Sequence, residues 1–435
     1  MDKLHITGGR QLSGRIIIGG AKNAALPLMC AALLTREKVT LDNVPYLADI
    51  TTMAKLLVQH GASLSLRDTS PGTLFGRDMP GHYSRELSLT CDSINNIVAP
   101  YDLVRTMRAS ILVLGPILAR EGKAKVSLPG GCAIGARPVD MHLKAMEALG
   151  ATITLEEGYV LATAPAGGLI GGDVHFEKVS VGATENVLMA AVLARGVTTI
   201  HNAAREPEIT DLAYMLISMG ADISGLGSST LTVRGVTALS GTRYRVIPDR
   251  IETGTYLAAV ALAGGELELV DAQPDTLGVV IDVMRAVGVK IDTRDDSILV
   301  SHDGSPLKPI DITTAPFPDF PTDMQAQLMT VLTQAEGDSQ LSETIFENRF
   351  MHVPELARMG ANISIDGHTA TVHGVTKLKG APVMATDLRA SVSMVIAALA
   401  ASGDTTVSRI YHLDRGYERI EEKLAACGAA IQRLR

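Results

Sequence analysis

The residue whose surroundings most favour chemistry is Cys132, in the segment Pro129-Gly-Gly-Cys-Ala-Ile-Gly-Ala-Arg-Pro-Val-Asp140. Proline and glycine disfavour a regular helix there, and the segment has no apolar period that would place the thiol in a core. A cysteine on such a loop, with Arg137 close in sequence, can act as a nucleophile or as a proton donor. We therefore expect Cys132 to take part in a reaction.

The other three cysteines show no sign of a chemical role. Cys30 and Cys427 lie within apolar helical patterns, so we expect them to pack as small buried groups, and Cys91 has no assignable role. The four positions contain no C-x-x-C pair and no zinc-type pairing with histidine. Their spacing is typical of free thiols in a reducing compartment.

A second candidate for chemistry is Asp323, which ends the segment Phe317-Pro-Asp-Phe-Pro-Thr-Asp323 just before a predicted helix. A carboxylate there can cap the helix by accepting hydrogen bonds from its free backbone N–H groups. It can equally act as a general base toward a substrate hydroxyl. The residues alone leave both roles open.

Charged side chains, most of them cationic, recur where predicted helices begin. A helix N-terminus already favours anions, so an added lysine or arginine is unfavourable there unless an anion binds. Any single one is most simply a solvated or salt-bridged side chain, but their recurrence favours a cleft for a ligand with several phosphate or carboxylate groups. The approaches to the helices carry Lys22-Asn23, Arg108, Lys178 with Ser180, Asp249-Arg250, Thr322-Asp323, Asp387-Leu-Arg389, Arg137, Arg205, Arg349 and Arg415.

The elements that must position these residues form a repeat. Six helical stretches each end in a glycine that leads into a short alternating strand, and the glycines are Gly61, Gly150, Gly220, Gly288, Gly360 and Gly428. Their spacings are 89, 70, 68, 72 and 68 residues. A glycine at a helix C-terminus supplies the positive φ that turns the chain into the strand. The longer first interval points to an insertion at Asp68–Glu86, which we expect to be a surface loop.

Each unit reads as a buried Ala-rich helix, a strand, an amphipathic helix and a second strand. The buried helices are expected at Ala24–Leu34, Met107–Ala119, Thr184–Ala194, Thr253–Ala263 and Ala390–Ala401, because they are apolar nearly all round. Six such units divide most simply into three and three, which predicts two similar α/β domains with a boundary near residue 245. Six independent small pieces would have poor cores.

Composition narrows the class of protein. The 435 residues carry a net charge of −8 with 3% aromatic residues, which argues against nucleic-acid binding. The N-terminal residues lack the apolar core of a secretory signal, and no stretch reaches the roughly 20 apolar residues of a membrane span. We therefore expect a cytoplasmic protein with no nucleic-acid or membrane partner.

Longer motifs carry a family resemblance. They are Gly20-Ala-Lys-Asn-Ala, the Cys132 segment, Asn202-Ala-Ala-Arg-Glu-Pro-Glu, Phe320-Pro-Thr-Asp-Met-Gln-Ala-Gln, Glu347-Asn-Arg-Phe-Met-His, Thr386-Asp-Leu-Arg-Ala-Ser and Leu413-Asp-Arg-Gly-Tyr-Glu. With these motifs the chain resembles the UDP-N-acetylglucosamine 1-carboxyvinyltransferase family of enolpyruvyl transferases, within the EPSP synthase-like superfamily, from about Leu4 to the C-terminus. That family has two inside-out α/β barrel domains of three repeats, with a substrate cleft between them. The resemblance implies domains at 22–247 and at 1–21 with 248–435.

The resemblance also implies a reaction. Enolpyruvate would pass from phosphoenolpyruvate to the 3′-hydroxyl of UDP-N-acetylglucosamine with release of phosphate, the first committed step of peptidoglycan synthesis. No metal or cofactor and no obligatory protein partner is implied. Cys132 would protonate phosphoenolpyruvate, form a covalent adduct with it and be the target of fosfomycin, while Asp323 would deprotonate the sugar hydroxyl.

Lys22, Arg137 and Arg415 would hold the phosphate and carboxylate of phosphoenolpyruvate, and Arg349 and Arg389 would support domain closure. The catalytic set implied by the resemblance is Cys132, Asp323, Lys22 and Arg415. The substrate-binding set is Lys22, Asn23, Arg108, Arg137, Pro138, Val139, Asp140, Met141, Lys178, Val179, Ser180, Val181, Asp323, Ile345, Arg349, Asp387, Arg389 and Arg415.

Two departures and three alternatives stand beside this reading. The chain has Gly19 where the family commonly has serine, and it has the Asp68–Glu86 insertion. The sister enolpyruvyl transferase that acts on shikimate 3-phosphate shares the architecture but does not use the Cys132 loop. An RNA 3′-phosphate cyclase should have a nucleotide-accepting histidine and a more basic surface. A catalytically silent regulator would have no need for both Cys132 and Asp323.

Overall fold

Six four-stranded sheets of one design form the outer layers of the molecule. The computed structural model describes residues 2–68, 85–129, 139–375 and 377–435, and within these ranges every sheet has one parallel strand pair followed by two antiparallel pairs. The same pattern recurs in the sheets formed later in the chain. The sequence repeat is therefore also a repeat of strand pairing.

The glycines that define the repeat behave as predicted. All six have positive φ, between 84° and 118°. A strand follows each of them within two residues, for example β8 (Thr152–Glu156) after Gly150. Because the left-handed conformation strains any residue with a Cβ, glycine at these six positions fixes where each amphipathic helix ends.

Three repeats surround a first hydrophobic core, built from residues between Ala21 and Val246. Its inner helices α1, α5 and α7 are apolar on most faces, and nine of the ten α1 residues are buried. The elements of this half are α1 (Lys22–Ala31), η1 (Ala32–Leu34), β3 (Val39–Val44), α2 (Ala48–Gln59), β4 (Ser63–Asp68), β5 (Arg85–Thr90), β6 (Val98–Ala99), α4 (Tyr101–Val104), η2 (Arg108–Val113), α5 (Leu114–Glu121), β7 (Lys123–Ser127), α6 (Asp140–Ala148), β8, β9 (Tyr159–Thr163), β10 (Asp173–His175), α7 (Val181–Ala191), β11 (Val197–His201), α8 (Pro207–Ser218), β12 (Asp222–Ser224), β13 (Thr230–Arg234) and β14 (Thr242–Arg245).

The other three repeats surround a second core, which draws on residues 4–18 and 251–431. Its inner helices α9, α11 and α13 contact one another. Its elements are β1 (Lys3–Thr7), β2 (Leu12–Ile17), α9 (Arg250–Ala263), β15 (Gly265–Val270), η3 (Pro274–Thr276), α10 (Gly278–Val287), β16 (Lys290–Thr293), β17 (Ser297–His302), β18 (Ile312–Thr313), η4 (Thr322–Met324), α11 (Gln325–Leu332), β19 (Asp338–Ser342), α12 (Val353–Arg358), β20 (Asn362–Asp366), β21 (Thr369–His373), β22 (Pro382–Met384), α13 (Ala390–Ala400), β23 (Asp404–Ser408), η5 (Ile410–Arg415), α14 (Ile420–Ala426) and β24 (Ala430–Leu434).

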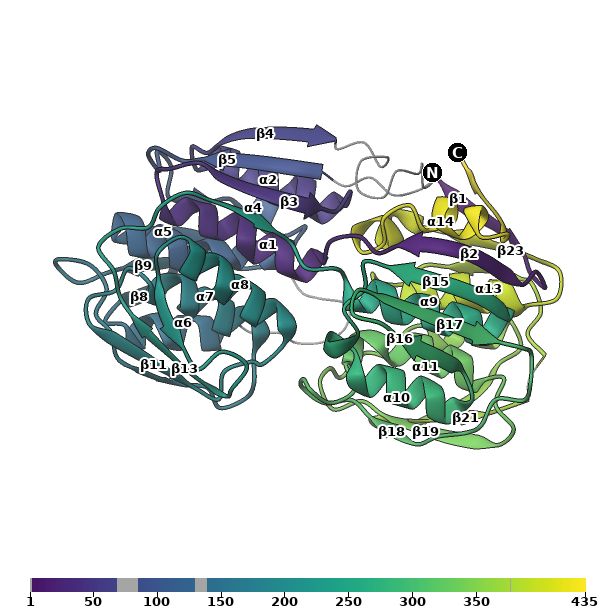
Figure 1. Cartoon of the computed structure of the whole chain (residues 1–435). Coiled ribbons are helices and arrows are strands. Elements are labelled where there is room, and N and C mark those ends of the chain that lie inside the picture. Colours follow the sequence, from purple (N-terminus) through teal and green to yellow (C-terminus); the bar gives the residue numbers. More distant parts are fainter. Residues whose placement is uncertain (1, 69–84, 130–138, 376) are drawn as a thin grey trace.

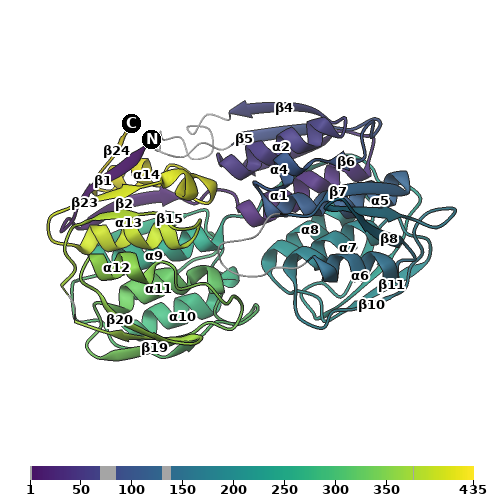
Figure 2. The same cartoon turned by 180° about the vertical axis from the view of Figure 1, so that it is seen from behind.

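The two cores form two lobes that lie side by side, with sheets outside and helices inside (Figures 1 and 2). This is the inside-out arrangement that the sequence predicts. Strands from distant parts of the chain complete three of the sheets: β14 joins β3, β2 joins β15, and β1 lies between β23 and β24. The first strands of the chain thus belong to the lobe that contains the C-terminus.

Two chain crossings connect the lobes, and they pair with each other. Gly20 forms an antiparallel bridge with Pro248, the N–H of Ala21 donates to the Ile247 carbonyl at 2.7 Å, and the N–H of Asp249 donates to the Gly19 carbonyl at 2.8 Å. The junction of the lobes is therefore a short hydrogen-bonded ribbon. None of the helices in the described ranges is long and apolar enough to span a bilayer.

The predicted Asp68–Glu86 loop needs a correction at its ends. Asp68, Arg85 and Glu86 lie in the paired strands β4 and β5, in register Asp68 with Arg85. Residues 69–84, between them, lie outside the described part of the chain. The other hairpins of this type, such as β8–β9, connect through only two to five residues, so the added length falls within one hairpin connection.

Candidate active site

Lys22 and Arg415 come from different lobes and meet at one carboxylate. Lys22 begins α1 and Arg415 ends η5. Asp49, in the first turn of α2, accepts from Lys22 Nζ at 3.3 Å and from Arg415 Nε at 2.8 Å. Burial lowers the pKa of Lys22, whereas Asp49 acts in the opposite sense. The carboxylate keeps two cations, predicted to hold a substrate anion, close together across the lobe boundary.

Asp323 is held between two buried arginines. Its Oδ1 accepts from Arg349 Nη2 at 2.8 Å and its Oδ2 from Arg389 Nε at 3.2 Å. Burial alone would raise the pKa of Asp323, but Arg349 and Arg389 keep that pKa well below its usual range. The carboxylate is therefore ionised at neutral pH, and it is a weak base as long as both arginines stay on it.

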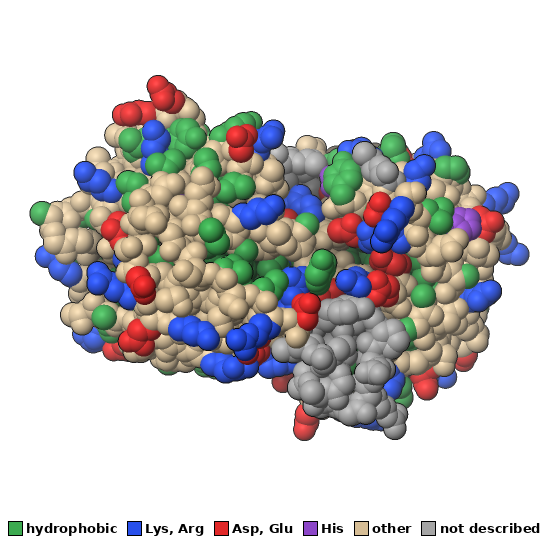
Figure 3. Space-filling view, turned by 90° about the horizontal axis from the view of Figure 1, so that it is seen from above, with side chains coloured by type: hydrophobic (Ala, Val, Ile, Leu, Met, Phe, Trp, Pro, Cys, Tyr) green, Lys and Arg blue, Asp and Glu red, His purple; other side chains and the backbone are tan. Residues whose placement is uncertain are grey.

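The cluster around Asp49 and the cluster around Asp323 interact electrostatically. The Lys22 charge interacts with Asp323, Arg389 and Arg415, and each of the two arginines lowers the lysine pKa. Charged side chains from both lobes thus come together as predicted. The five residues are Lys22, Arg389, Arg415, Asp323 and Arg349, the last through its ion pair with Asp323. Seen from above, basic and acidic side chains gather along the junction of the lobes (Figure 3).

Several of the predicted site residues are placed at helix starts. Asn23 is the second residue of α1, Arg108 begins η2, and Val139 precedes α6, which starts at Asp140 and continues with Met141. Lys178 and Val179 lead to Ser180, whose hydroxyl caps α7 by accepting from the Ala183 N–H, and Val181 begins that helix. These residues therefore lie at or just before helix starts, and their roles toward substrate stay predictions.

Other predicted residues have mainly local contacts. Asp387 Oδ1 accepts from the N–H groups of Arg389 and Ala390, so it fixes the backbone that carries Arg389. Ile345 donates its N–H to Glu343 at 2.8 Å. Among the residues with described positions, no hydrogen bond or ion pair joins Lys178, Met141 or Ile345 to the charged clusters.

Three predicted residues, Cys132, Arg137 and Pro138, lie outside the described residues. Their roles stay predictions. The remaining cysteines are buried, as expected for Cys30 and Cys427. Cys91 is buried as well, and burial raises its pKa.

Two predicted cleft residues have other main partners. Arg250 donates from Nε to Glu208 of α8 at 3.0 Å, and its charge also interacts with Asp323. Arg205 is exposed and donates to the Gly227 carbonyl. Asp323 does not cap its helix, since Pro321 precedes η4, whereas Asp249 caps α9 through the N–H groups of Ile251 and Glu252.

Sequence reasoning missed the anionic partners Asp49 and Glu208. Each stands 12 residues before the capping glycine of its repeat (61 − 49 and 220 − 208), and each pairs with an arginine of the other lobe. The equivalent positions of the other four repeats are Pro138, Thr276, Asn348 and Gly416, so the acidic residue occurs in only two of the six repeats.

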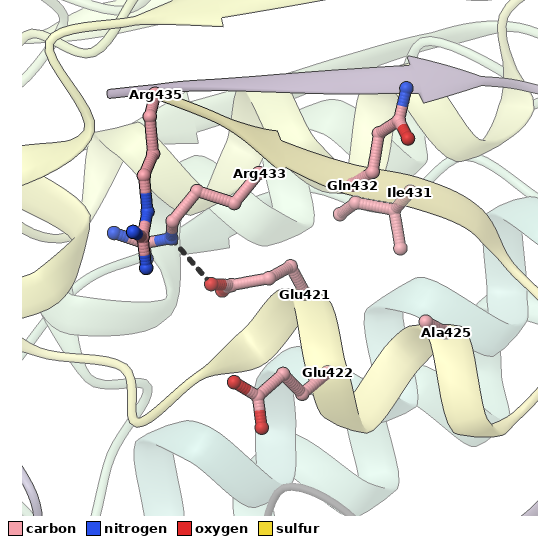
Figure 4. A pocket seen from close by; sticks show the side chains of 7 residues that line it. All are labelled: Glu421, Glu422, Ala425, Ile431, Gln432, Arg433 and Arg435. Carbon is pink, nitrogen blue, oxygen red and sulfur yellow. Dashed lines mark hydrogen bonds and ion pairs between the residues drawn. The ribbon is translucent and has the colours of Figure 1, made fainter. Parts of the chain in front are cut away.

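A surface pocket of about 310 Å³ lies elsewhere, between α14 and β24. Its lining includes Glu421 and Arg433, which form an ion pair of 2.6 Å, and it contains none of the predicted site residues (Figure 4). The charged clusters at the lobe junction remain the better candidate, because they bring together the residue types that the chemistry needs.

Comparisons with known proteins agree with this geometry. The family model of EPSP synthase (3-phosphoshikimate 1-carboxyvinyltransferase) matches residues 6–424. A UDP-N-acetylglucosamine 1-carboxyvinyltransferase from Agrobacterium fabrum is 57% identical over 435 residues, covering all of both chains. One from Rhodospirillum centenum is 58% identical over 435 residues, covering 100% of this chain and 99% of the relative. Because these alignments run end to end, the Asp68–Glu86 segment is not extra length relative to them.

Solved structures show the same fold. The enolpyruvyl transferase NikO from Streptomyces tendae superposes with a TM-score of 0.86 at 26% identity, covering 99% of this chain and 98% of that one. An EPSP synthase from Acinetobacter baumannii, at 18% identity, has a TM-score of 0.73 over the whole of both chains. By sequence over its full length and by fold, the chain belongs to the family of UDP-N-acetylglucosamine 1-carboxyvinyltransferases, within the wider EPSP synthase family.

Proposed function

We propose that this chain transfers enolpyruvate from phosphoenolpyruvate to the 3′-hydroxyl of UDP-N-acetylglucosamine and releases phosphate. The observation that carries the proposal is the full-length similarity to relatives with that activity in their names. Opposed lobes that bring Lys22 and Arg415 near Asp323, Arg349 and Arg389 support it, because the reaction needs anion-binding cations beside a carboxylate. The product would enter peptidoglycan synthesis, and the enzyme would work in the cytoplasm.

The proposed chemistry is an addition followed by an elimination. Cys132 gives a proton to the methylene carbon of phosphoenolpyruvate, and the adjacent carbon gains oxocarbenium character. The sugar hydroxyl attacks that carbon and loses its proton to Asp323. The Cys132 thiolate then takes a proton back from the new methyl group, which expels phosphate and restores the double bond. Lys22, Arg137 and Arg415 stabilise charge on the phosphate, and closure of the lobes keeps water out. No cofactor or metal enters these steps.

Asp323 must change partners before it can act in this scheme. With Arg349 and Arg389 both on the carboxylate, proton transfer from a sugar hydroxyl is unfavourable. The carboxylate of phosphoenolpyruvate is a competing anion for either guanidinium. Its arrival would draw an arginine away and raise the pKa of Asp323, so the base would become active only when phosphoenolpyruvate is bound.

The test is phosphate release from purified protein. We expect release to require phosphoenolpyruvate and UDP-N-acetylglucosamine together. The family model's description gives shikimate 3-phosphate as the alternative acceptor, and release with that acceptor in place of the UDP-sugar would overturn the assignment.

A further inference from the structure

A buried polar cluster lies directly behind Asp323, and the proposed reaction does not use it. It consists of Thr255 on α9, Gln327 on α11 and Tyr417, between η5 and α14. All three side chains are buried, and Thr255 and Gln327 are wholly inaccessible to solvent. Burying an amide and two hydroxyls is unfavourable unless their hydrogen bonds are made, and apolar residues would fill this core more simply.

The hydrogen bonds of the cluster have a defined direction. Thr255 Oγ1 donates to the Ile251 carbonyl at 2.7 Å, so it must accept from the Tyr417 hydroxyl at 3.0 Å. Tyr417 Oη is then free to accept, and Gln327 Nε2 lies 3.2 Å from it. The arrangement leaves the Tyr417 oxygen as an acceptor for cationic donors.

The cluster reaches the predicted active site at two points. Gln327 Nε2 donates to the main-chain carbonyl of Asp323 at 3.0 Å. The guanidinium of Arg389 lies 5.5 Å from the centre of the Tyr417 ring, and the Tyr417 side chain favours its charged form. Together with the Arg389–Asp323 ion pair, these contacts close a ring of four residues. One side of the ring holds the backbone of the proposed base and the other holds its counterion.

We propose that Tyr417 and Gln327 are positioning residues for Asp323. Tyr417 holds the guanidinium of Arg389 and Gln327 holds the main chain of Asp323, with Thr255 orienting the Tyr417 hydroxyl. The cluster thereby fixes the positions of Arg389 and Asp323 before the substrate carboxylate draws Arg389 away from Asp323. This inference rests on the proposed role of Asp323 as the base, but its structural part holds for any reaction at this carboxylate.

The chain offers a matched control in Tyr256. Like Tyr417, it is buried in the second core, and its hydroxyl donates to Glu252 at 3.2 Å. Its hydrogen bond is made to Glu252 and not to a residue of the ring. The variants Tyr417→Phe and Tyr256→Phe therefore each remove one buried hydroxyl, and only the first touches the ring.

The first measurement is steady-state phosphate release. We expect kcat of Tyr417→Phe to fall about tenfold, the effect of losing one polar interaction with a charged group. The KM for UDP-N-acetylglucosamine should stay unchanged, and Tyr256→Phe should behave like wild type. Thr255→Val should reproduce the fall in kcat, and Thr255→Ser, which keeps the hydroxyl, should restore it.

The second measurement needs no substrate. In a double-mutant cycle, the cost of Tyr417→Phe to the unfolding constant should be about fivefold smaller in an Asp323→Asn background, whereas Tyr256→Phe should cost the same in both. This coupling would support the positioning role even if the wild-type protein released no phosphate. Absence of phosphate release would overturn only the proposed function. Equal stability losses for both tyrosine variants, with no coupling and unchanged kcat, would show that the cluster only packs the core.

Discussion

Asp49 and Arg415 form an ion pair of 2.8 Å, although 366 positions separate them in the chain. The pair joins the two lobes at the point where Lys22 also reaches the Asp49 carboxylate. The Asp49 carboxylate thus pairs with Lys22 and Arg415, the two cations that we expect to bind a substrate anion. Contact between the lobes at this point therefore depends on the charges of Asp49, Lys22 and Arg415.

Asp49→Asn should therefore change both stability and pH dependence. Without the carboxylate, burial lowers the pKa of Lys22 unopposed by Asp49, so the alkaline limb of kcat/KM for phosphoenolpyruvate should move to lower pH. The free energy of unfolding should fall by about 3 kcal/mol, the lower end for a broken buried ion pair, because Arg415 remains partly solvated. A pH–rate profile and urea unfolding measure the two effects.

Glu208→Gln is the control for that variant. It breaks the corresponding pair with Arg250 and should lose stability in a similar way. Because neither Arg250 nor Glu208 is among the charged groups that shift the pKa of Lys22, the alkaline limb should stay in place. An equal shift of the limb in both variants would contradict the link between Asp49 and Lys22.

Asp323→Asn should abolish most of the turnover. An amide cannot accept the hydroxyl proton, and general bases contribute roughly 10²–10⁴-fold to rates. Calorimetry should show that UDP-N-acetylglucosamine still binds. Asp319→Asn, an exposed aspartate four positions earlier, should retain wild-type activity. Substantial phosphate release by Asp323→Asn would assign the proton to another group.

The depressed pKa of Asp323 also gives a signed stability prediction. Because Arg349 and Arg389 lower it below the unfolded value, the carboxylate contributes stability that is present above the unfolded pKa. That contribution is lost as pH falls through the folded pKa. Acid titration followed by circular dichroism should thus show wild type losing this extra stability relative to Asp323→Asn only on the acid side of the unfolded pKa.

Alkylation of the native protein at neutral pH should modify Cys132 alone. The other three thiols are buried, and burial raises the pKa of each, to about 11 for Cys427. Iodoacetamide followed by intact-mass and peptide mapping should show a single adduct that is absent from Cys132→Ser. Prior incubation with both substrates should protect it. A principal adduct on Cys91 would be incompatible with the proposed role of Cys132.

Gly20→Ala should destabilise the junction of the lobes. A Cβ there would lie 1.8 Å from the Asn43 carbonyl oxygen, a backbone atom, so the crossing segment must shift. We expect the free energy of unfolding to fall by about 1–3 kcal/mol or more. Gly19→Ala should cost less, because its Cβ would meet the carboxylate of Glu418 at 3.1 Å, the end of a side chain. Thermal unfolding of both variants decides the order.

Local signals predict the fold well. The capping glycines locate the amphipathic helix of each repeat, and all-round apolar stretches locate the buried helix of five repeats, because a positive φ and full burial leave direct marks on the sequence. The strands β1, β2 and β14 are different. Their pairing with sheets of distant repeats depends on chain closure, which no local pattern records.

The site is only partly predictable for a similar reason. Lys22 and Asp323 carry charges at helix starts and Arg415 ends η5, before α14, so their types and phases reveal them. Asp49 resembles any acidic residue in a first helical turn, where a carboxylate is favourable without a partner. Tyr417 and Gln327 resemble ordinary core positions. Their roles depend on which inner helix ends meet, and this is settled by packing between repeats.

The position of β1 between β23 and β24 has a consequence for how the chain is made. β1 pairs only with β23 and β24, so the sheet of the sixth repeat cannot form until both of those strands have been synthesised. At 5–20 residues per second, β1 waits roughly 20–80 s for β23. The lobe around the first core is contiguous and can fold during that wait. During that interval β1 is an unpaired strand, which is open to pairing with other chains.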